Sequence, residues 1–404
     1  MKKIFYGWWI VVASFFIGLY KSSVIFFGFT AFVEPIIQEF GWSYTQVSFA
    51  ASLRGLEMGI FSPVVGFLVD RFGCRILILV GSLIVGFALL LMSYTHSLAM
   101  FYVSFLLLAF GAGGCAGVVL LAAVANWFQR NVGKAFGIVA AGIGASGLLI
   151  PLIVGMIDSY GWRTALVILA VGMWIIGIPL SLVLRHSPEK YGYLPDGDLA
   201  VNPLPSQERM PENGFNFKEA LRDKNFLYLN LVEFIRHTVI SAVVIHVMPY
   251  LSGVGMSRMN AGLVAAGIPI FSIIGRVGFG WIADVYDKRY AFASAFGLMS
   301  AGLLAFCYAP SEKLVILFLL LFPPGFGGGM VLRSSVVREY FGRKSFGKVI
   351  GCVMGTGSIG GVIGPTLAGW VFDTWGSYDP VWFSFIGLSG LASWLTLRMK
   401  TWRK

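Results

Sequence analysis

Charged residues are scarce in this sequence: only 12% of its 404 residues are Asp, Glu, Lys or Arg, whereas 57% are hydrophobic. Soluble globular domains have about 25% charged residues, so this chain cannot build a water-soluble surface. The four cysteines lie mostly inside apolar stretches at unrelated spacings, which indicates neither a disulfide framework nor a zinc site. No Walker-type phosphate loop and no nucleophile and base pattern are present, so we expect no ATP-driven pump, no enzyme and no cofactor.

What the sequence does contain is a succession of apolar runs, and its mean hydropathy is +0.80. A membrane-spanning helix needs about 20 mostly apolar residues. The runs predict an all-α integral membrane protein with twelve transmembrane helices. We expect these at residues 8–33, 46–69, 75–95, 98–127, 134–157, 162–184, 226–250, 259–283, 290–309, 314–336, 347–371 and 378–397.

The chain is divided by a stretch of linker composition, residues 186–222, in which prolines alternate with charged residues. This predicts an N-terminal six-helix bundle at 1–185 and a C-terminal one at 223–404. A constant spacing of 214 residues relates the halves. It matches Gly137, Gly147, Pro151 and Gly155 with Gly351, Gly361, Pro365 and Gly369. Because Gly and Pro fix close helix contacts and bends, the common spacing indicates one backbone built twice, as in many transporters.

Lysine and arginine give the chain a formal net charge of +11, and they concentrate in alternate loops. By the positive-inside rule, both termini and the linker are predicted to be cytoplasmic. The basic residues form no cluster on a soluble module, so we expect the lipid bilayer and not nucleic acid as the surrounding partner. We expect the chain to function as a monomer.

A motif lies between the second and third predicted helices. From Gly66 to Arg75 the sequence is Gly-Phe-Leu-Val-Asp-Arg-Phe-Gly-Cys-Arg, and a degenerate copy runs from Gly280 to Arg289. The first copy resembles the Gly-x-x-x-Asp-Arg-x-Gly-x-Arg signature of the major facilitator superfamily. The resemblance implies that fold and a conformational latch; the alternative is that the charges only fix orientation. The latch residues would be Asp70, Arg71, Arg75, Asp284 and Arg289.

Within that superfamily, the chain resembles bacterial monocarboxylate-transporter-like proteins in Tyr6–Trp9, in Trp127–Gly147 and at Arg276. The resemblance implies a secondary transporter of a small monocarboxylate or related organic anion, working by alternating access in symport with a proton. It also implies a bacterial cytoplasmic (inner) membrane, and Arg276 as the carboxylate ligand. The sequence departs from the family's animal members at Ser272, where they have an acidic residue one turn before that arginine.

Ionisable residues inside the predicted spans cost at least about 2.5–3.5 kcal/mol each on insertion scales, so each is a candidate functional residue. Arginine binds carboxylates bidentately, and a buried Glu or a His can exchange a proton during a cycle. We therefore expect an anion site built from Arg276, Lys21, Arg54 and Arg236, and proton-coupling residues among Glu57, Glu233 and His237.

Structural roles compete with these hypotheses. Arg54 with Glu57, and Glu233 with Arg236, are spaced for ion pairs that only hold helices together. Lys21 is either an anion contact or the partner of Glu57. The remaining candidates have simpler roles: Arg333 and Arg338 could reach the headgroups, and His246 would be a pore-rim or structural histidine.

Other functions remain as alternatives. An exporter of drugs or other solutes from the same superfamily would share the fold, but an excess of cations in the core disfavours cationic drugs. A sensor would need a signalling domain. A channel would not need a twofold repeat with gating motifs.

Overall fold

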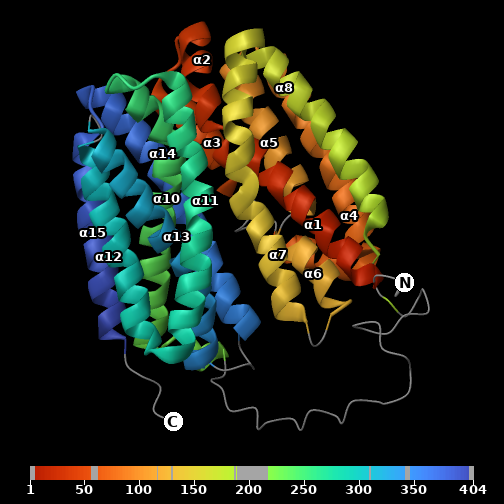
Figure 1. Ribbon diagram of the computed structural model, residues 1–404, viewed down its shortest axis with the longest axis vertical. Coiled ribbons are helices and arrows are strands. Elements are labelled where there is room, and N and C mark those ends of the chain that lie inside the picture. The colour runs from red at the N-terminus through yellow and green to blue at the C-terminus, as the bar shows by residue number, and fades with distance from the viewer. Residues whose placement is uncertain are drawn as a thin grey trace. The chain divides into compact units, whose positions relative to one another are not determined.

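The computed structural model describes residues 5–55, 62–115, 117–128, 131–185, 188, 217–308, 311–341 and 346–399. Every regular element in these ranges is helical (Figure 1), which confirms the predicted all-α fold. The chain packs into two compact units, Met1–Gly28 with Ile60–Met210 and Phe29–Gly59 with Pro211–Lys404. The division at 1–185, 186–222 and 223–404 stays a prediction.

In its described residues, the first unit contains long apolar helices with two irregular helical segments, a π-helix directly after Lys21 and a 3-10 helix beginning at Ser146. Its elements are α1 (Tyr6–Lys21), the π-helix η1 (Ser22–Phe27), α4 (Ser62–Ser93), α5 (Leu98–Gly114), α6 (Gly117–Ala125), α7 (Val132–Ala145), the 3-10 helix η3 (Ser146–Leu149) and α8 (Ile150–Val183). The hydroxyl of Ser23 donates to the carbonyls of Leu19 and Ser146, both at 2.7 Å, and so joins the two irregular segments.

The described part of the second unit contains two short helices from early in the chain and the helices that follow residue 216. Its elements are α2 (Thr30–Phe40), α3 (Tyr44–Ser52), α9 (Phe217–Ala220), α10 (Lys224–Gly253), α11 (Arg258–Val285), α12 (Lys288–Cys307), α13 (Glu312–Phe341), α14 (Phe346–Trp375) and α15 (Asp379–Arg398).

Ten helical stretches of the described residues are long and apolar enough to cross a membrane. One of them, Gly133–Val183, turns at Gly161, where φ is 78°, so it holds two spans. The described residues thus hold eleven spans. The remaining predicted span, residues 46–69, runs over residues 56–61, which lie outside the described residues, and α3 and the start of α4 lie on either side of that gap. The same φ recurs at Gly73 inside α4, and only glycine adopts it readily.

The outside of the helices is as apolar as the inside. Phe87, Leu148 and Val277 are 58%, 63% and 70% exposed, although side chains of this kind are normally buried in soluble proteins. Helices that are hydrophobic on all faces belong in lipid, because hydrocarbon then replaces water as the outer environment.

Glycines bring α14 against α10, and α13 against α11. A Cβ atom on Gly360 would lie 2.3 Å from the carbonyl oxygen of Phe234, and one on Gly364 would lie 2.0 Å from that of Thr238. A Cβ on Gly327 would lie 2.0 Å from the carbonyl oxygen of Ser272. Backbones can approach this closely only at glycine. The glycine at position 327 of α13 therefore allows close approach to α11 in this unit.

The packing of α2 and α3 in the second unit depends on polar contacts. Thr30 donates to the carbonyl of Ile245 at 2.9 Å, and Arg258 donates to that of Ala31 at 2.6 Å. The carboxylate of Asp373 accepts from the backbone of Tyr44 and Thr45, at 3.0 and 2.8 Å. A carboxylate in this position satisfies unpaired N–H groups at a helix N-terminus.

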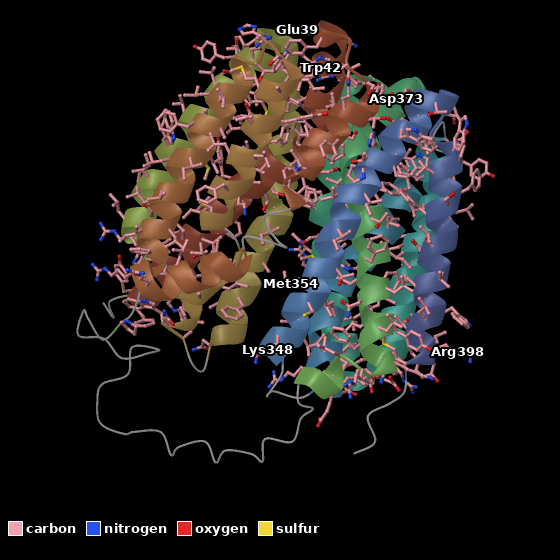
Figure 2. The ribbon with its side chains drawn as sticks, turned by 180° about the vertical axis from the view of Figure 1, so that it is seen from behind. Glu39, Trp42, Lys348, Met354, Asp373 and Arg398 are labelled. Atoms are coloured by element: carbon pink, nitrogen blue, oxygen red, sulfur yellow. The ribbon has the colours of Figure 1, made fainter. Side chains whose placement is uncertain are left out.

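The two ends of the second unit differ in charge. Figure 2 shows Glu39, Trp42 and Asp373 at one end and Lys348 and Arg398 at the other. Arg398 of α15 thus shares an end with Lys348 of α14, and Arg289 of α12 donates to the carbonyl of Met399, next to Arg398. Such a distribution is expected if positive charges collect on one side of a membrane.

Candidate anion and proton site

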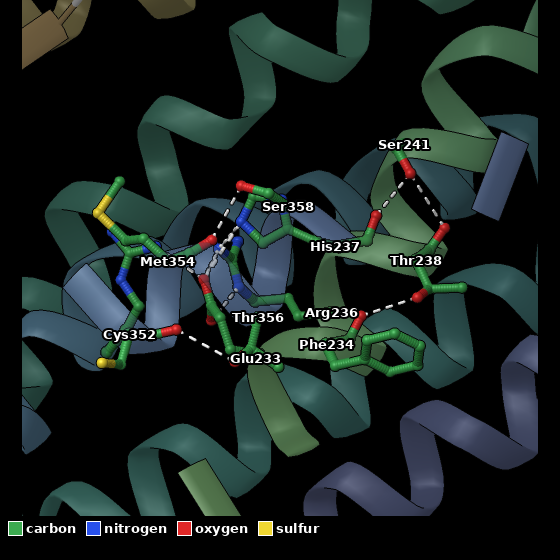
Figure 3. Close-up of polar contacts among 11 residues, drawn as sticks. Glu233, Phe234, Arg236, His237, Thr238, Ser241, Cys352, Met354, Thr356 and Ser358 are labelled. Carbon is green, nitrogen blue, oxygen red and sulfur yellow. Dashed lines mark hydrogen bonds and ion pairs between the residues drawn. The ribbon is translucent and has the colours of Figure 1, made fainter. Parts of the chain in front are cut away.

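Three charged or titratable side chains meet on one face of α10. Residues three and four apart lie one above the other on a helix, so Glu233, Arg236 and His237 share a face. Arg236 binds the carboxylate of Glu233 bidentately: its Nε donates to Oε2 at 2.8 Å and its Nη2 to Oε1 at 2.5 Å. Figure 3 shows the three side chains turning toward one another beside Met354 and Ser358 of α14.

A fourth member comes from α13. Nη1 of Arg333 donates to Oε1 of Glu233 at 2.7 Å, across a sequence separation of 100 residues. The suggestion that Arg333 reaches the headgroups is therefore wrong, because this arginine is buried and ion-paired. Its neighbour Arg338 is exposed. We call Glu233, Arg236, His237 and Arg333 the charge cluster.

The charge cluster is positive and almost closed to solvent. One carboxylate faces two guanidiniums, so the formal charge is +1 when His237 is neutral. The side chains of Glu233 and Arg236 are 0% and 2% exposed, whereas those of Arg333 and His237 are 10% and 18% exposed. Removing ions from water costs several kcal/mol each, so the ion pairs chiefly offset a desolvation penalty. One positive charge stays without a counter-ion inside the charge cluster.

His237 lies between a hydrogen-bond donor and a hydrogen-bond acceptor. Its Nε2 atom is 2.9 Å from Nη2 of Arg236 and 3.2 Å from Oε1 of Glu233. A guanidinium can only donate and a carboxylate can only accept. Neutral His237 with an unprotonated Nε2 therefore accepts from Arg236, whereas a proton on Nε2 directs the ring to Glu233. A proton placed on Nε2 therefore exchanges one hydrogen-bond partner for the other.

Glycine and a polar pair support the charge cluster. A Cβ on Gly357 of α14 would lie 2.9 Å from Cδ2 of His237 and 3.2 Å from Cγ of Glu233, so only glycine leaves room for both side chains. One turn earlier on α10, Asn230 accepts a hydrogen bond from Thr356 of α14 at 2.7 Å. These contacts fix α14 against the face that carries the charge cluster.

The other predicted site residues lie on different elements. Arg276 is half-buried on α11, and Ser272, one turn before it, donates to the carbonyl of Pro269. Arg54 is buried at the end of α3, where its Nε donates to the carbonyl of Ala51 and its guanidinium lies 5.6 Å from the ring centre of Phe29.

Lys21, in the first unit, is the last residue of α1 and precedes the π-helix. Such π-turns are frequent at functional sites. Glu57 lies outside the described residues, so neither its pairing with Arg54 nor its pairing with Lys21 can be followed.

The predicted latch is described only in part. The side chains of Asp70 and Asp284 lie outside the described residues, while Arg71 and Arg75 are exposed on α4. In the second copy, Arg289 binds the carboxylate of Asp287, with 2.7 Å between Nη2 and Oδ2, and donates to the carbonyl of Met399. Hydrogen bonds from Arg289 hold the pKa of Asp287 below its usual value. The latch roles stay predictions.

His246 takes the structural role. It is fully buried on α10, with Nε2 2.9 Å from the carbonyl oxygen of Pro365 and Nδ1 3.0 Å from the hydroxyl of Tyr378. Because a carbonyl can only accept, Nε2 carries the proton and Nδ1 accepts from Tyr378. The hydroxyl of Ser48 also lies 3.0 Å from Nε2. His246 thereby joins α10 to α3 and α14. Among the described residues, no group of His, Cys, Asp and Glu could hold a metal ion.

The family model of the Major Facilitator Superfamily matches residues 10–335 and 247–403. The chain belongs to this superfamily. Monocarboxylate transporter 13 of Bos taurus is 26% identical over 380 residues, covering 92% of this chain and 84% of that protein. Monocarboxylate transporter 12 of Xenopus laevis is 24% identical over 390 residues, with the same coverage. MFS transporter asaE of Aspergillus flavus is 25% identical over 415 residues, covering 97% and 86%.

Two solved structures of transport proteins have the same fold as this chain. A bacterial homologue of the human lysosomal transporter Spinster, inward-facing and occupied, has a TM-score of 0.75 at 14% identity and covers 98% of each chain. The nucleoside transporter NupG, in a mutant form, has a TM-score of 0.78 at 12% identity and covers 97% of this chain and 99% of that chain. The protein is thus a monocarboxylate-transporter-like membrane transporter and not an enzyme.

Proposed function

We propose that this transporter carries a small monocarboxylate or a related organic anion by alternating access, in symport with a proton. The observation that carries the proposal is the surplus positive charge of the charge cluster, which a bound anion would neutralise. An uncompensated charge in a membrane interior is costly and marks a substrate or ion pathway by default. The names of the relatives at 24% and 26% identity agree with a monocarboxylate as the substrate.

A proton-coupled cycle needs a group whose charge can change near neutral pH. Two guanidiniums stabilise the negative charge of Glu233, which makes it a poor proton carrier. His237 is the better candidate, because its Nε2 lies 3.2 Å from a carboxylate oxygen that can accept a hydrogen bond from the protonated ring. A proton on His237 would raise the charge of the cluster and so favour an anion, and by linkage the anion would favour the proton.

Arg276 remains the candidate for a second anion contact, and Lys21 and Arg54 for further ones. Ser272 cannot replace the carboxylate that the family's animal members have beside this arginine, so we propose that the acid and base functions lie on α10 instead. Glu57 and Glu233 stay alternative proton sites.

An exporter of drugs or other solutes is the competing function, and the similarity to MFS transporter asaE keeps it open. The basic charge cluster disfavours cationic drugs but is compatible with anionic or neutral solutes. We also propose a bacterial inner membrane, a monomeric carrier, and cytoplasmic termini. The basic end of the second unit, at Lys348 and Arg398, supports the orientation.

The test is uptake of radiolabelled lactate, pyruvate and acetate into proteoliposomes, with and without an inward proton gradient. Wild type, Arg276→Ala and the exposed control Arg338→Ala are compared. We expect gradient-stimulated uptake by wild type and control, and its loss in Arg276→Ala. If no monocarboxylate moves, the substrate class is wrong. If Arg276→Ala transports normally, the role of Arg276 is wrong.

A further inference from the structure

The two arginines of the charge cluster are used unequally. Arg236 places both Nε and Nη2 on the carboxylate of Glu233, so the edge of its guanidinium that suits a carboxylate is occupied. Arg333 gives Glu233 a single hydrogen bond through Nη1. Its Nε is buried and, within the described part of the chain, has no hydrogen-bond acceptor.

A buried N–H without an acceptor is unfavourable and calls for an explanation. Nε and Nη2 form one edge of a guanidinium and bind the two oxygens of a carboxylate side by side. In Arg333 this edge does not serve Glu233, which lies at Nη1. A carboxylate arriving there would give Nε the acceptor that it lacks.

Resting on the proposed function, we propose that Arg333 is a binding residue for the transported anion and that Arg236 is not. Arg236 neutralises Glu233, and the resulting neutral pair holds Arg333 in position through Oε1. The surplus charge of the cluster therefore belongs to Arg333.

The exposed fractions of the side chains also favour Arg333 over Arg236 as the anion-binding residue. The side chain of Arg236 is 2% exposed, and a Cβ on Gly329 would lie only 3.1 Å from its Cδ, so Arg236 is packed in place. Arg333 is 10% exposed and His237 is 18% exposed, and these two form the accessible side of the cluster. An anion would reach Arg333 beside the proposed proton site.

One surplus charge and one open guanidinium edge define the ligand class. While His237 is neutral, the site fits an anion with a single carboxylate, because a second carboxylate would find no surplus charge within the cluster. A neutral amide of the same shape lacks the charge and should bind weakly. The prediction distinguishes lactate from lactamide, and lactate from succinate.

The test uses purified full-length protein and two measurements: thermal stabilisation by lactate, lactamide or succinate, and the KM for lactate uptake in proteoliposomes. The variants are Arg333→Gln, Arg333→Lys and the exposed control Arg338→Gln. Arg333→Gln leaves the neutral pair of Glu233 and Arg236, so we expect it to fold. Its half-saturating lactate concentration should rise at least about tenfold, the loss expected for a charge-assisted hydrogen bond.

Arg333→Lys keeps the charge beside Glu233 but loses the planar edge, so it should fold and bind lactate more weakly than wild type. Arg338→Gln should match wild type. If lactate stabilises wild type and both Arg333 variants at the same concentration, the assignment of Arg333 is overturned while the proposed function stands. If lactate, pyruvate and acetate neither stabilise nor enter through wild type, both are overturned.

Discussion

Glu233 is the residue on which the other members of the charge cluster converge. One oxygen of its carboxylate, Oε1, lies within 3.2 Å of nitrogen atoms of three residues, Arg236, His237 and Arg333. A carboxylate that is 0% exposed persists in charged form only because these donors replace the water it has lost. Glu233 therefore sets the position of both guanidiniums, even though the surplus charge lies on Arg333.

Replacing Glu233 should be severe. Glu233→Gln leaves two guanidiniums facing a neutral amide in a buried site, and breaking a buried pair in this way typically costs about 3–5 kcal/mol. We expect a much lower melting temperature in detergent.

The matched control is Glu339→Gln, which breaks the ion pair of Glu339 with Lys288 at a site where the Glu339 side chain is 43% exposed. Surface pairs contribute about 0–1 kcal/mol, so this melting temperature should hardly change. Equal losses in the two variants would contradict the account.

His237 should determine the pH dependence of transport. For wild type, we expect lactate uptake at subsaturating concentration to fall as the pH rises, because the neutral ring no longer adds charge to the cluster. His237→Gln should remove this dependence. The measurement is initial uptake between pH 5.5 and 8 with the same pH on both sides, and an unchanged pH profile in His237→Gln would exclude this role.

Three members of the charge cluster could be predicted from the sequence and one could not. Glu233, Arg236 and His237 are visible because their spacing places them on one helical face. Arg333 was misjudged because the helix was expected to end at residue 336, whereas α13 continues to Phe341 and places Arg333 deeper. Pairing across 100 residues leaves no local pattern.

The glycines of α14 that the sequence repeat matches differ from the glycines that contact α10. The repeat singled out Gly351 and Gly361, yet no heavy atom of a described neighbour lies within 4 Å of a Cβ built on either. The glycines that bring α14 against α10 are Gly360 and Gly364, which the repeat does not match with glycines. The sequence repeat therefore identified α14 as a glycine-rich helix, but it did not identify the glycines that contact α10.

This difference can be tested on one helix. Gly364→Ala places a Cβ 2.0 Å from the carbonyl oxygen of Thr238, so α14 must move away from α10. Overpacking of this kind costs about 1–3 kcal/mol, and we expect a lower melting temperature and weaker lactate uptake. Gly361→Ala, with nothing within 4 Å, is the control and should be close to wild type. The reverse order of stabilities would contradict the packing described for α14.

The π-helix after Lys21 was also not predictable. Residues 22–27 contain neither Gly nor Pro, the usual signs of an interrupted helix. The irregularity coincides with the bond from Ser23 to the carbonyl of Ser146, a contact between distant parts of the chain. A contact between residues so far apart in the sequence leaves no pattern in the residues around Ser23.

For the molecule as a whole, composition and apolar run lengths were sufficient to predict the fold. An apolar chain must satisfy its backbone inside helices, so twelve runs imply twelve spans. The packing of residues 29–59 with 211–404 depends instead on particular contacts, such as that of Arg258 with Ala31.

Orientation in the membrane can be tested at the two ends of α14. We expect a membrane-impermeant maleimide to label Thr374→Cys on intact cells, and Lys348→Cys only after the membrane is disrupted, because basic residues stay in the cytoplasm. Both positions are exposed. The protein without either substitution gives the background from its four native cysteines. The opposite labelling would reverse the proposed topology.

The surplus charge of the cluster also has an electrical consequence. Moving one elementary charge through a potential of 100 mV changes its energy by about 2.3 kcal/mol. When His237 is neutral, an empty cluster carries +1 and feels this force as access changes sides. A cluster that holds one carboxylate and a proton on His237 also carries +1, because the two added charges cancel. The voltage across the membrane would then act equally on the loaded and the empty carrier, and the complete cycle would move no net charge.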